Sequence, residues 1–368
     1  MKICQECIVP DSFPKVGFEN GRCTFCRNYS DFTKTRPNIL GKEKLIEILT
    51  SKKAKKYDCL VPLSGGKDSS FILFYIVKEL NLKPLAAHFD SGFSAGSNQN
   101  NIEKICQKLS VDLVIGKASR YRKKFVEEAL KVAKYKDRFG NVCANCENNI
   151  RSFGINEAVK REIPFIIWGS TDFEESPSVF LDSNASTSQE GFGKFMVYKM
   201  AKKVIGKMVE FVKLKVSLMG KLKIIIYYLR MSYYSIRDNF ENRAPEGYKR
   251  LNPLLEVSFE GKKVKTIYFF NYIQSDPINN IETLKKEIGW EAPSGKEIRA
   301  DCKIHHIVNY QQLKDTGITQ DGFNLSVLVR AGLLTRAEAM HRENIIKNGL
   351  ARECQKFCDE LSIKIKDF

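Results

Sequence analysis

The feature that most constrains the fold is a short apolar run followed by a glycine turn and an apolar-periodic helix. Residues 57–63, YDCLVPL, have the pattern of a short buried strand, and the turn SGGKDSS, Ser64–Ser70, follows directly. Residues 71–80 then repeat apolar side chains at helical spacing. Adjacent glycines let the backbone approach a ligand closely, and a helix N-terminus presents free N–H groups and a positive dipole end to an anion. The sequence therefore predicts a phosphate-binding turn between a strand and a helix.

The alternation of strands and helices continues after this turn. We expect further strands at 82–89, 112–115 and 164–168, with helices at 98–109 and 125–135. This order is typical of a parallel sheet, so the expected fold class is α/β, a doubly wound, Rossmann-like parallel sheet. Ligands bind such sheets at the carboxyl ends of the strands. The residues that this places on one rim are Ser64–Ser70, His88–Asp90 and Gly169–Asp172.

The turn is neither a Walker A motif, GxxxxGK[ST], nor a GxGxxG fingerprint. It resembles the SGGxDS signature of the PP-loop ATP pyrophosphatases, a superfamily with a HUP-like sheet. The resemblance implies that the turn holds the pyrophosphate end of ATP and that AMP is transferred to a substrate oxygen. Asp68 would then bind Mg²⁺, with Lys67 as an additional cation. The residues that would hold the phosphates are Ser64, Gly65, Gly66, Lys67, Asp68, Ser69 and Ser70.

A second part of the predicted rim also resembles this superfamily. Gly169 and Asp172 match its second motif, in which a glycine and an acidic residue face the nucleotide. Asp172 is the second Mg²⁺ candidate, because Mg²⁺ takes one or two carboxylates together with phosphate oxygens and water. His88 and Asp90 would border the adenosine. An ordinary strand-end role is the alternative for His88.

Two CxxC pairs, Cys4–Cys7 and Cys23–Cys26, lie at the start of the chain, separated by a loop that contains prolines and glycines. Such a loop has no core of its own. Four thiolates at this spacing suit a closed structural Zn²⁺ site with no position open for water. The sequence thus predicts a zinc ion that orders the N-terminal segment, and four buried thiols without metal are the alternative.

A further cysteine pair, Cys143 and Cys146, precedes a helix expected to begin at about Glu147. A helix N-terminus lowers the pKa of a thiol, which favours metal binding or nucleophilic reactivity. With the distant Cys302, this pair would hold an iron–sulfur cluster, as in the PP-loop tRNA sulfurtransferases that the arrangement resembles. With His305 added, the group would hold a second zinc. Ordinary thiols without metal are the third interpretation.

Basic residues concentrate in one part of the chain. The formal net charge is +17, and residues 194–230 contain ten Lys or Arg with one acidic residue, Glu210. Their apolar side chains follow helical spacing, which predicts basic amphipathic helices. A peripheral membrane contact, an acidic partner, a nucleotide-sugar site and an insertion packed on its own domain are all compatible with this pattern. No apolar run approaches the roughly 20 residues that span a bilayer, so we expect a cytoplasmic protein, with the inner face of the membrane as one location.

The pattern divides the chain into four parts. These are a Cys4 zinc-binding module at 1–40, a PP-loop ATP pyrophosphatase core at 41–190, a basic helical insertion at 191–250 and an α-rich C-terminal part at 251–368 that completes the active site. In the last part, Thr335 and Glu338 form a capping box that begins a helix, and Gly349 is expected to separate it from a final helix.

The whole chain resembles the N-acetyl sugar amidotransferases of the WbpG and PseA type. The stretches that carry this resemblance are Cys4–Cys26, Ser64–Ser70, Cys143–Cys146, Arg299–His306 and Thr319–Ser326. The resemblance implies a ligase that uses ATP, Mg²⁺ and Zn²⁺ to convert the acetamido group of a UDP-linked N-acetyl sugar into an acetamidino group. The pathway implied is the biosynthesis of surface polysaccharide, such as lipopolysaccharide O-antigen, or of another glycan.

No cysteine of the chain has the setting of a glutaminase nucleophile. None lies in a GxCxG elbow, and position 2 is Lys2 rather than a cysteine. We therefore expect ammonia from a partner, a HisH-like class I glutaminase. Two alternatives remain open: a PP-loop enzyme that thiolates tRNA, for which the positive charge suits RNA binding, and a non-catalytic nucleotide-binding scaffold. RNA is a partner only in the first of these, and DNA is expected in none.

Overall fold

The computed structural model describes residues 2–35, 39–52, 55–94, 96–133, 140–169, 218–241, 249–252, 256–259, 262–274, 276–291 and 302–362. Asp172 and most of the predicted basic insertion, residues 191–217, lie outside these ranges. No helix within them is long and apolar enough to cross a membrane.

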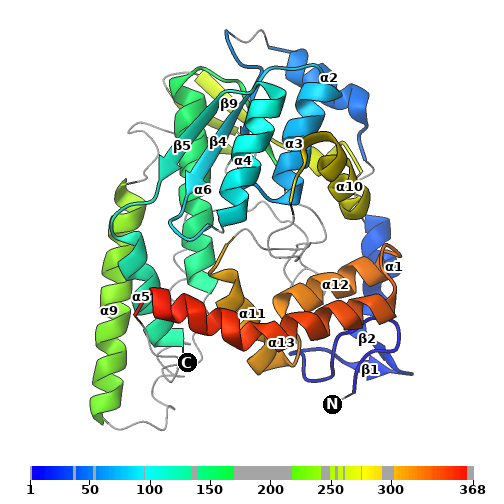
Figure 1. Cartoon of the computed structure of the whole chain (residues 1–368), viewed down its shortest axis with the longest axis vertical. Coiled ribbons are helices and arrows are strands. Elements are labelled where there is room, and N and C mark those ends of the chain that lie inside the picture. Colours follow the sequence, from blue (N-terminus) through cyan, green and yellow to red (C-terminus); the bar gives the residue numbers. More distant parts are fainter. Residues whose placement is uncertain are drawn as a thin grey trace.

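A seven-stranded sheet forms the centre of the molecule (Figure 1), with the strand order β5-β4-β3-β6-β9-β8-β7. Its five parallel strands are β3 (Cys59–Pro62), β4 (Pro84–Asp90), β5 (Leu113–Lys117), β6 (Phe165–Trp168) and β9 (Lys262–Tyr268). Antiparallel strands β8 (Glu256–Phe259) and β7 (Lys249–Asn252) extend one edge. The predicted α/β class with a parallel sheet is confirmed. The sheet also takes three strands from 249–268, which the sequence pattern had assigned largely to an α-rich part.

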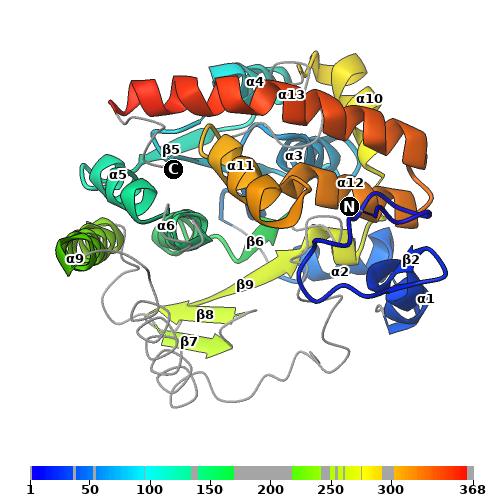
Figure 2. The same cartoon turned by 90° about the horizontal axis from the view of Figure 1, so that it is seen from below.

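Helices cover both faces of this sheet (Figures 1 and 2). On one face lie α2 (Lys42–Thr50), α3 (Lys67–Lys78), α4 (Gly96–Leu109) and α10 (Pro277–Ile288). The other face is covered by α6 (Gly140–Lys160), and α5 (Arg122–Ala133) and α9 (Leu218–Glu241) pack against α6 and against each other. A short 3-10 turn, η2 (Phe269–Asn271), follows β9. Because helices shield both faces, the central strands carry uninterrupted apolar runs such as FIIW in β6.

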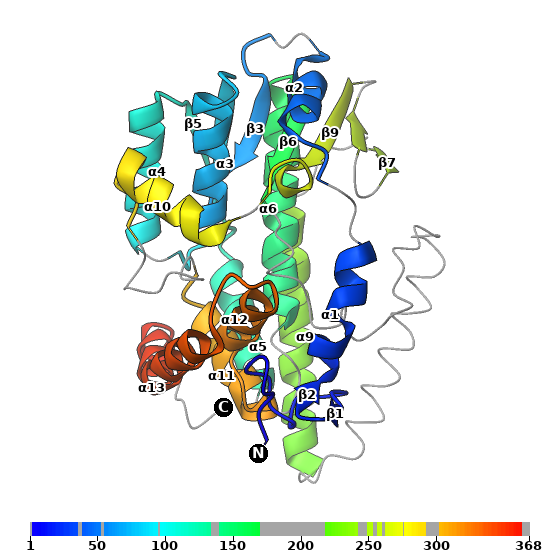
Figure 3. The ribbon, with the colours of Figure 1, turned by 90° about the vertical axis from the view of Figure 1, so that its right-hand side faces the viewer.

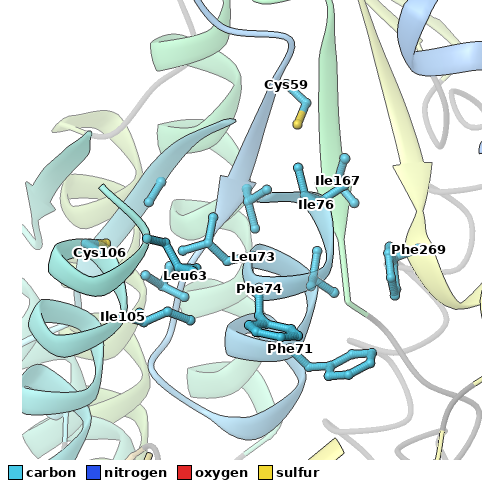
Figure 4. Close-up of a cluster of buried hydrophobic side chains, with 14 of the residues drawn as sticks. Cys59, Leu63, Phe71, Leu73, Phe74, Ile76, Ile105, Cys106, Ile167 and Phe269 are labelled. Carbon is cyan, nitrogen blue, oxygen red and sulfur yellow. The ribbon is translucent and has the colours of Figure 1, made fainter. Parts of the chain in front are cut away.

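The largest part of the core lies between β3, β4, β6 and the buried face of α3 (Figure 4). Phe71, Leu73, Phe74 and Ile76 supply that face. This is the helix that the periodicity of residues 71–80 predicts, although it begins earlier, at Lys67, inside the glycine turn. The burial of α3 therefore anchors its N-terminus, and with it the predicted phosphate-binding turn.

The N-terminal module packs against the last helices and not against the sheet (Figure 3). It consists of β1 (Phe18–Glu19), β2 (Arg22–Cys23) and α1 (Thr24–Thr35). Its partners are α11 (His305–Thr316), α12 (Gln320–Arg330) and α13 (Arg336–Glu360). Phe13 and Phe25 contact the ring of Phe323, with centroids 5.3 and 5.2 Å away. The two ends of the chain thus share one hydrophobic core.

Helix α13 confirms one expectation and corrects another. Thr335 caps its N-terminus by accepting a hydrogen bond from the Glu338 N–H at 3.2 Å. Gly349, however, lies inside the helix, which continues to Glu360. Leu350, Cys354 and Phe357 are buried beyond the glycine, and their burial outweighs the roughly 1 kcal/mol by which glycine disfavours a helix.

Helix α9 is held to α5 and α6 by a buried charged network. The Asp238 carboxylate is fully buried and lies 3.4 Å from the Arg122 guanidinium, whose exposed fraction is 2%. It also accepts hydrogen bonds from Ser119 at 2.7 Å and from Asn149 at 2.8 Å. A buried charge that loses its partner is strongly destabilising, so Asp238 is the point at which α9 is fixed.

We therefore expect Asp238→Ala to lower the free energy of unfolding by about 3–5 kcal/mol, because it leaves the Arg122 charge buried without its carboxylate. Urea titration followed by circular dichroism measures this. The control is Asp315→Ala, which removes an exposed carboxylate of α11 and should stay within about 0.5 kcal/mol of wild type. Equal stability of the two variants would contradict the assignment.

Candidate functional site

The turn after β3 has the geometry of an anion-binding loop. Gly65 has φ +79°, a left-handed conformation that favours glycine, and a Cβ there would lie 2.5 Å from the Asn98 carbonyl oxygen. Gly66 then occupies the N-cap position of α3 in extended conformation, with no side-chain cap. Gly66 has no side chain that could cap the first N–H groups of α3, and helix N-termini are where proteins bind phosphate.

Serine hydroxyls fix the shape of the turn. Ser69 Oγ accepts a hydrogen bond from the Ser64 N–H at 3.1 Å and lies 3.1 Å from the Ser64 hydroxyl. Ser64 Oγ in turn accepts from the Gly66 N–H at 3.3 Å. These bonds close the turn upon itself, so its backbone is preorganised before any ligand binds.

The two charged residues of the turn form a largely buried ion pair at the start of α3. Lys67 Nζ lies 2.6 Å from Asp68 Oδ2, and the two side chains are only 11% and 12% exposed. An acidic residue in the first turn is stabilised by the helix dipole. The pair places a cation and a Mg²⁺-type ligand at the N-terminus of α3, as the resemblance implies for Lys67 and Asp68.

The Gly65 carbonyl is held by groups from two other parts of the chain. The Trp290 indole Nε1–H donates to it at 3.0 Å, and Asn101 Nδ2 donates at 3.4 Å. Asn101 also bonds the backbone of Glu291, with its Nδ2 2.9 Å from the carbonyl oxygen and its Oδ1 3.1 Å from the N–H. With its carbonyl fixed in this direction, the Gly65 peptide has one orientation.

The strand order reverses direction beside this turn. The chain runs from β3 to β4 and β5 on one side, and then returns to β6 on the other side of β3. The carboxyl ends of β3 and β6 therefore form a topological switch point, where doubly wound sheets bind ligands. Gly169, which follows β6, lies against α3: a Cβ there would approach Ile72 Cδ1 to 2.6 Å and Asp68 Cβ to 3.9 Å. The predicted meeting of Gly169 with the turn is thus seen in the structure, whereas Asp172 lies outside the described residues.

His88 and Asp90 end β4 next to the turn. His88 is buried, and its Nδ1 lies 2.9 Å from the carbonyl oxygen of Leu63, the residue before Ser64. Within the described part of the chain, its Nε2 and both side-chain polar atoms of Asn98 have no hydrogen-bond partner, although all are buried. Buried polar atoms of this kind are typical of a site that a ligand completes. Asp90 accepts from the Gly92 N–H at 2.8 Å, which shapes the following loop.

The four N-terminal cysteines come together in one buried group. All four sulfur atoms lie within 4.8 Å of one another, with 3.7 Å between Cys4 and Cys26 and 3.6 Å between Cys7 and Cys23. The Cys23 N–H donates to Cys4 Sγ at 3.3 Å, which stabilises a thiolate there. Hydrogen bonds among the thiols lower the pKa of Cys4 and Cys23 and raise the pKa of Cys7 and Cys26.

This donor set fits Zn²⁺. A tetrahedral site requires four soft ligands at close approach with no opening, and all four cysteines are buried. The first CxxC pair is held from outside, because Arg336 Nε donates to the carbonyl oxygens of Cys4 at 3.0 Å and Cys7 at 2.9 Å. The ion would order the module and, through Arg336, its contact with α13.

The other predicted cysteine set forms no comparable group among the described residues. Cys143 and Cys146 lie inside α6, which begins at Gly140 and not at the expected Glu147. Cys302 forms an isolated antiparallel β-bridge with Ser94 in the loop after β4. The Lys303 N–H donates to the Phe93 carbonyl oxygen at 2.9 Å. A metal or cluster at these three cysteines stays a prediction.

His305 has a different partner from the one considered. Its Nε2 lies 2.7 Å from Asp321 Oδ1, and Asn309 donates to the other carboxylate oxygen at 2.7 Å. This buried polar network ties α11 to α12. Asp321, which belongs to the stretch Thr319–Ser326, therefore has a structural role.

Several residues that shape the turn were not singled out by the sequence pattern. Trp290, Asn98 and Asn101 lie far from the glycines in the sequence, the first in a loop and the other two near the N-terminus of the polar helix α4. The one available signal was compositional, since Trp290 is one of two tryptophans and asparagines recur from Asn98 to Asn101.

The comparisons with known proteins are sparse. No family model matches the chain. An uncharacterized protein of Methanocaldococcus jannaschii is 27% identical over 115 residues, which is 30% of this chain and 41% of that relative's length. Among solved structures, an NH3-dependent NAD synthetase from Campylobacter jejuni subsp. jejuni NCTC 11168, in complex with the nitrate ion, is similar over 55% of this chain and 96% of its own. The TM-score is 0.27 at 15% identity, so the fold class rests on the strand order and not on this likeness.

The zinc interpretation generates a metal-content prediction. Cys7→Ser and Cys26→Ser should each lose the bound zinc and lower the soluble yield, because the module lacks a core of its own without the ion. Metal analysis of the purified proteins measures this. Cys354→Ser, which changes a buried thiol outside the group, should keep the wild-type zinc content, and unchanged zinc in both test variants would refute the site.

The bracing of Gly65 generates a second prediction. Trp290→Phe keeps an aromatic ring but removes the hydrogen bond to the Gly65 carbonyl, so it should cost about 1 kcal/mol of stability and speed amide exchange at residues 64–67. Hydrogen exchange with mass spectrometry provides the measurement. Trp168→Phe is the matched control, since that ring packs beneath Arg151 and should leave exchange in the turn unchanged.

Proposed function

We propose that this chain is an ATP-dependent, AMP-forming ligase that replaces the acetamido oxygen of a nucleotide-linked N-acetyl sugar with nitrogen from ammonia. The observation that carries this proposal is the turn Ser64–Ser70, preorganised at the switch point of a parallel sheet, with Lys67 and Asp68 at the N-terminus of α3. The resemblance of this turn to the PP-loop signature supports ATP as the anion. The finer substrate assignment rests on the resemblance of the longer motifs to N-acetyl sugar amidotransferases.

The proposed chemistry follows from the weakness of an amide as an electrophile. The acetamido oxygen attacks the α-phosphorus of ATP and pyrophosphate leaves, giving an O-adenylyl imidate. Ammonia then adds to the imidate carbon, loses a proton, and AMP departs with the original oxygen. The product is an acetamidino group.

The chain's residues would contribute positioning and charge. Backbone N–H groups of the turn and the Lys67 ammonium would bind the phosphates, and Asp68 would hold the Mg²⁺ that neutralises charge on the pyrophosphate. The side-chain atoms of Asn98 and His88 lie beside the turn and would meet the rest of the nucleotide. None of these groups releases ammonia from glutamine, so we propose that a class I glutaminase supplies it at the same rim, where water would otherwise hydrolyse the imidate.

Product analysis with the purified full-length chain tests the proposal. With ATP, Mg²⁺, a UDP-linked N-acetyl sugar and ammonium, it should release AMP and pyrophosphate and yield a sugar in which NH replaces one oxygen. Asp68→Asn should reduce AMP release by roughly a hundredfold or more, because a transition-state charge loses its stabilisation. The exposed Asp315→Asn is the matched control and should retain activity.

The nitrogen source provides a second arm of the same experiment. Glutamine alone should support no amidination, and adding a class I glutaminase should restore it. Release of ADP and phosphate would contradict the assignment of the turn. AMP with thiolated tRNA would instead establish the tRNA thiolation alternative, and glutamine-dependent amidination by the isolated chain would show that no partner is needed.

A further inference from the structure

Helix α9 exposes a continuous apolar stripe. Seven large hydrophobic side chains along it have exposed fractions between 38% and 66%. They are Met219, Leu222, Ile225, Ile226, Leu229, Tyr233 and Ile236. No other described helix exposes as many large apolar residues, and the helix lies at the edge of the molecule in Figures 1 and 2. Exposed apolar patches of this kind mark interaction sites.

The stripe lies opposite the face that anchors the helix. Met231, Tyr234 and Asp238 face α5 and α6, where Met231 and Tyr234 join the core and Asp238 pairs with Arg122. At 100° per residue, the exposed apolar side chains lie on the far side of the helix from these three. The protein thus holds α9 rigidly by one face and presents the other outward.

Basic residues line one edge of the stripe. Lys223 and Arg230 are exposed, are spaced seven apart and fall next to the apolar positions, whereas Arg237, seven residues further on, donates to the Tyr121 hydroxyl at 3.0 Å. No acidic residue occurs between residues 218 and 237. Lys124 of the adjoining α5 lies over the Tyr234 ring at 5.8 Å, which adds a further cation beside α9. The residues that precede α9 in the sequence, 194–217, contain seven lysines and one acidic residue.

This charge pattern disfavours a second copy of the chain as the occupant. Antiparallel pairing of two α9 helices about Arg230 would set Lys223 of one copy against Arg237 of the other, and Arg230 against its own equivalent. Parallel pairing would offer these cations no acidic partner. A self-associating helix of this length would therefore lack favourable flanking pairs.

We propose that the exposed face of α9 binds an anionic lipid bilayer, lying in the plane of the interface. A coiled-coil seam has two apolar positions per heptad, and the apolar face of α9 is wider than that. A wide apolar face with cations at its edge is the pattern of helices that lie at a membrane interface. The inference stands independently of the proposed ligase activity, because it uses none of the residues around the turn.

Vesicle co-sedimentation of the full-length chain tests the inference. Wild type should sediment with vesicles of mixed phosphatidylcholine and phosphatidylglycerol, and much less with phosphatidylcholine alone or at high salt. The double variant Leu229→Glu, Ile236→Glu should lose binding by at least about tenfold, because it charges the C-terminal half of the stripe. Lys223→Gln with Arg230→Gln should weaken binding by roughly tenfold to thirtyfold and reduce its salt dependence.

The controls separate a surface effect from a folding effect. Ile345→Glu charges a similarly exposed isoleucine on α13, 55% exposed, and should sediment like wild type. All substituted side chains are exposed, so urea unfolding midpoints should match that of wild type. Sedimentation unaffected by the Leu229 and Ile236 changes would overturn the proposal. Failure of the wild type to bind anionic vesicles would also overturn it. In that case, light scattering would show whether this face instead forms a dimer or binds an acidic protein.

Discussion

The Gly65 carbonyl is the point on which the candidate site depends. It receives hydrogen bonds from Trp290, which follows α10, and from Asn101 in α4, while the backbone of Asn98 closes against the glycine itself. Three segments far apart in the sequence thus converge on one peptide group. Glycine adopts a left-handed conformation at little cost, but it adopts others equally easily. The hydrogen bonds to the Gly65 carbonyl therefore select the single orientation of the turn.

The remaining architecture brings the two ends of the chain to the same edge of the sheet. The N-terminal cysteine module has no core of its own and borrows one from α12 and α13, through Phe13, Phe25 and Phe323. A hydrogen bond from the Lys303 N–H to the Phe93 carbonyl oxygen holds the start of α11 against the loop after β4. Helices α11, α12 and α13 therefore face the carboxyl ends of the strands (Figure 1).

Polar networks position the elements that apolar packing alone would leave free to slide. Asp238 fixes α9 through Arg122, Ser119 and Asn149, and Asp321 fixes α12 through His305 and Asn309. Burial and hydrogen bonds to Thr319 and Lys347 act in opposite directions on Glu343; burial prevails and raises the pKa of that carboxyl. Each network is satisfied only in one arrangement of its helices, because a buried charge without its partner is costly.

The sequence by itself determined the local features of this protein. Apolar periodicity, adjacent glycines and paired cysteines were enough to predict the β3–turn–α3 unit, the parallel sheet, the gathering of Cys4, Cys7, Cys23 and Cys26, and the cap at Thr335. Each depends on neighbouring residues or on a repeated local pattern. Tertiary structure decided the rest. It extended the sheet through β7 to β9, carried α13 through Gly349, started α6 before Cys143, paired His305 with Asp321 and brought Trp290 to Gly65. These outcomes depend on which surfaces meet after folding, and burial free energy gained across long sequence separations overrides the local preferences that a sequence displays.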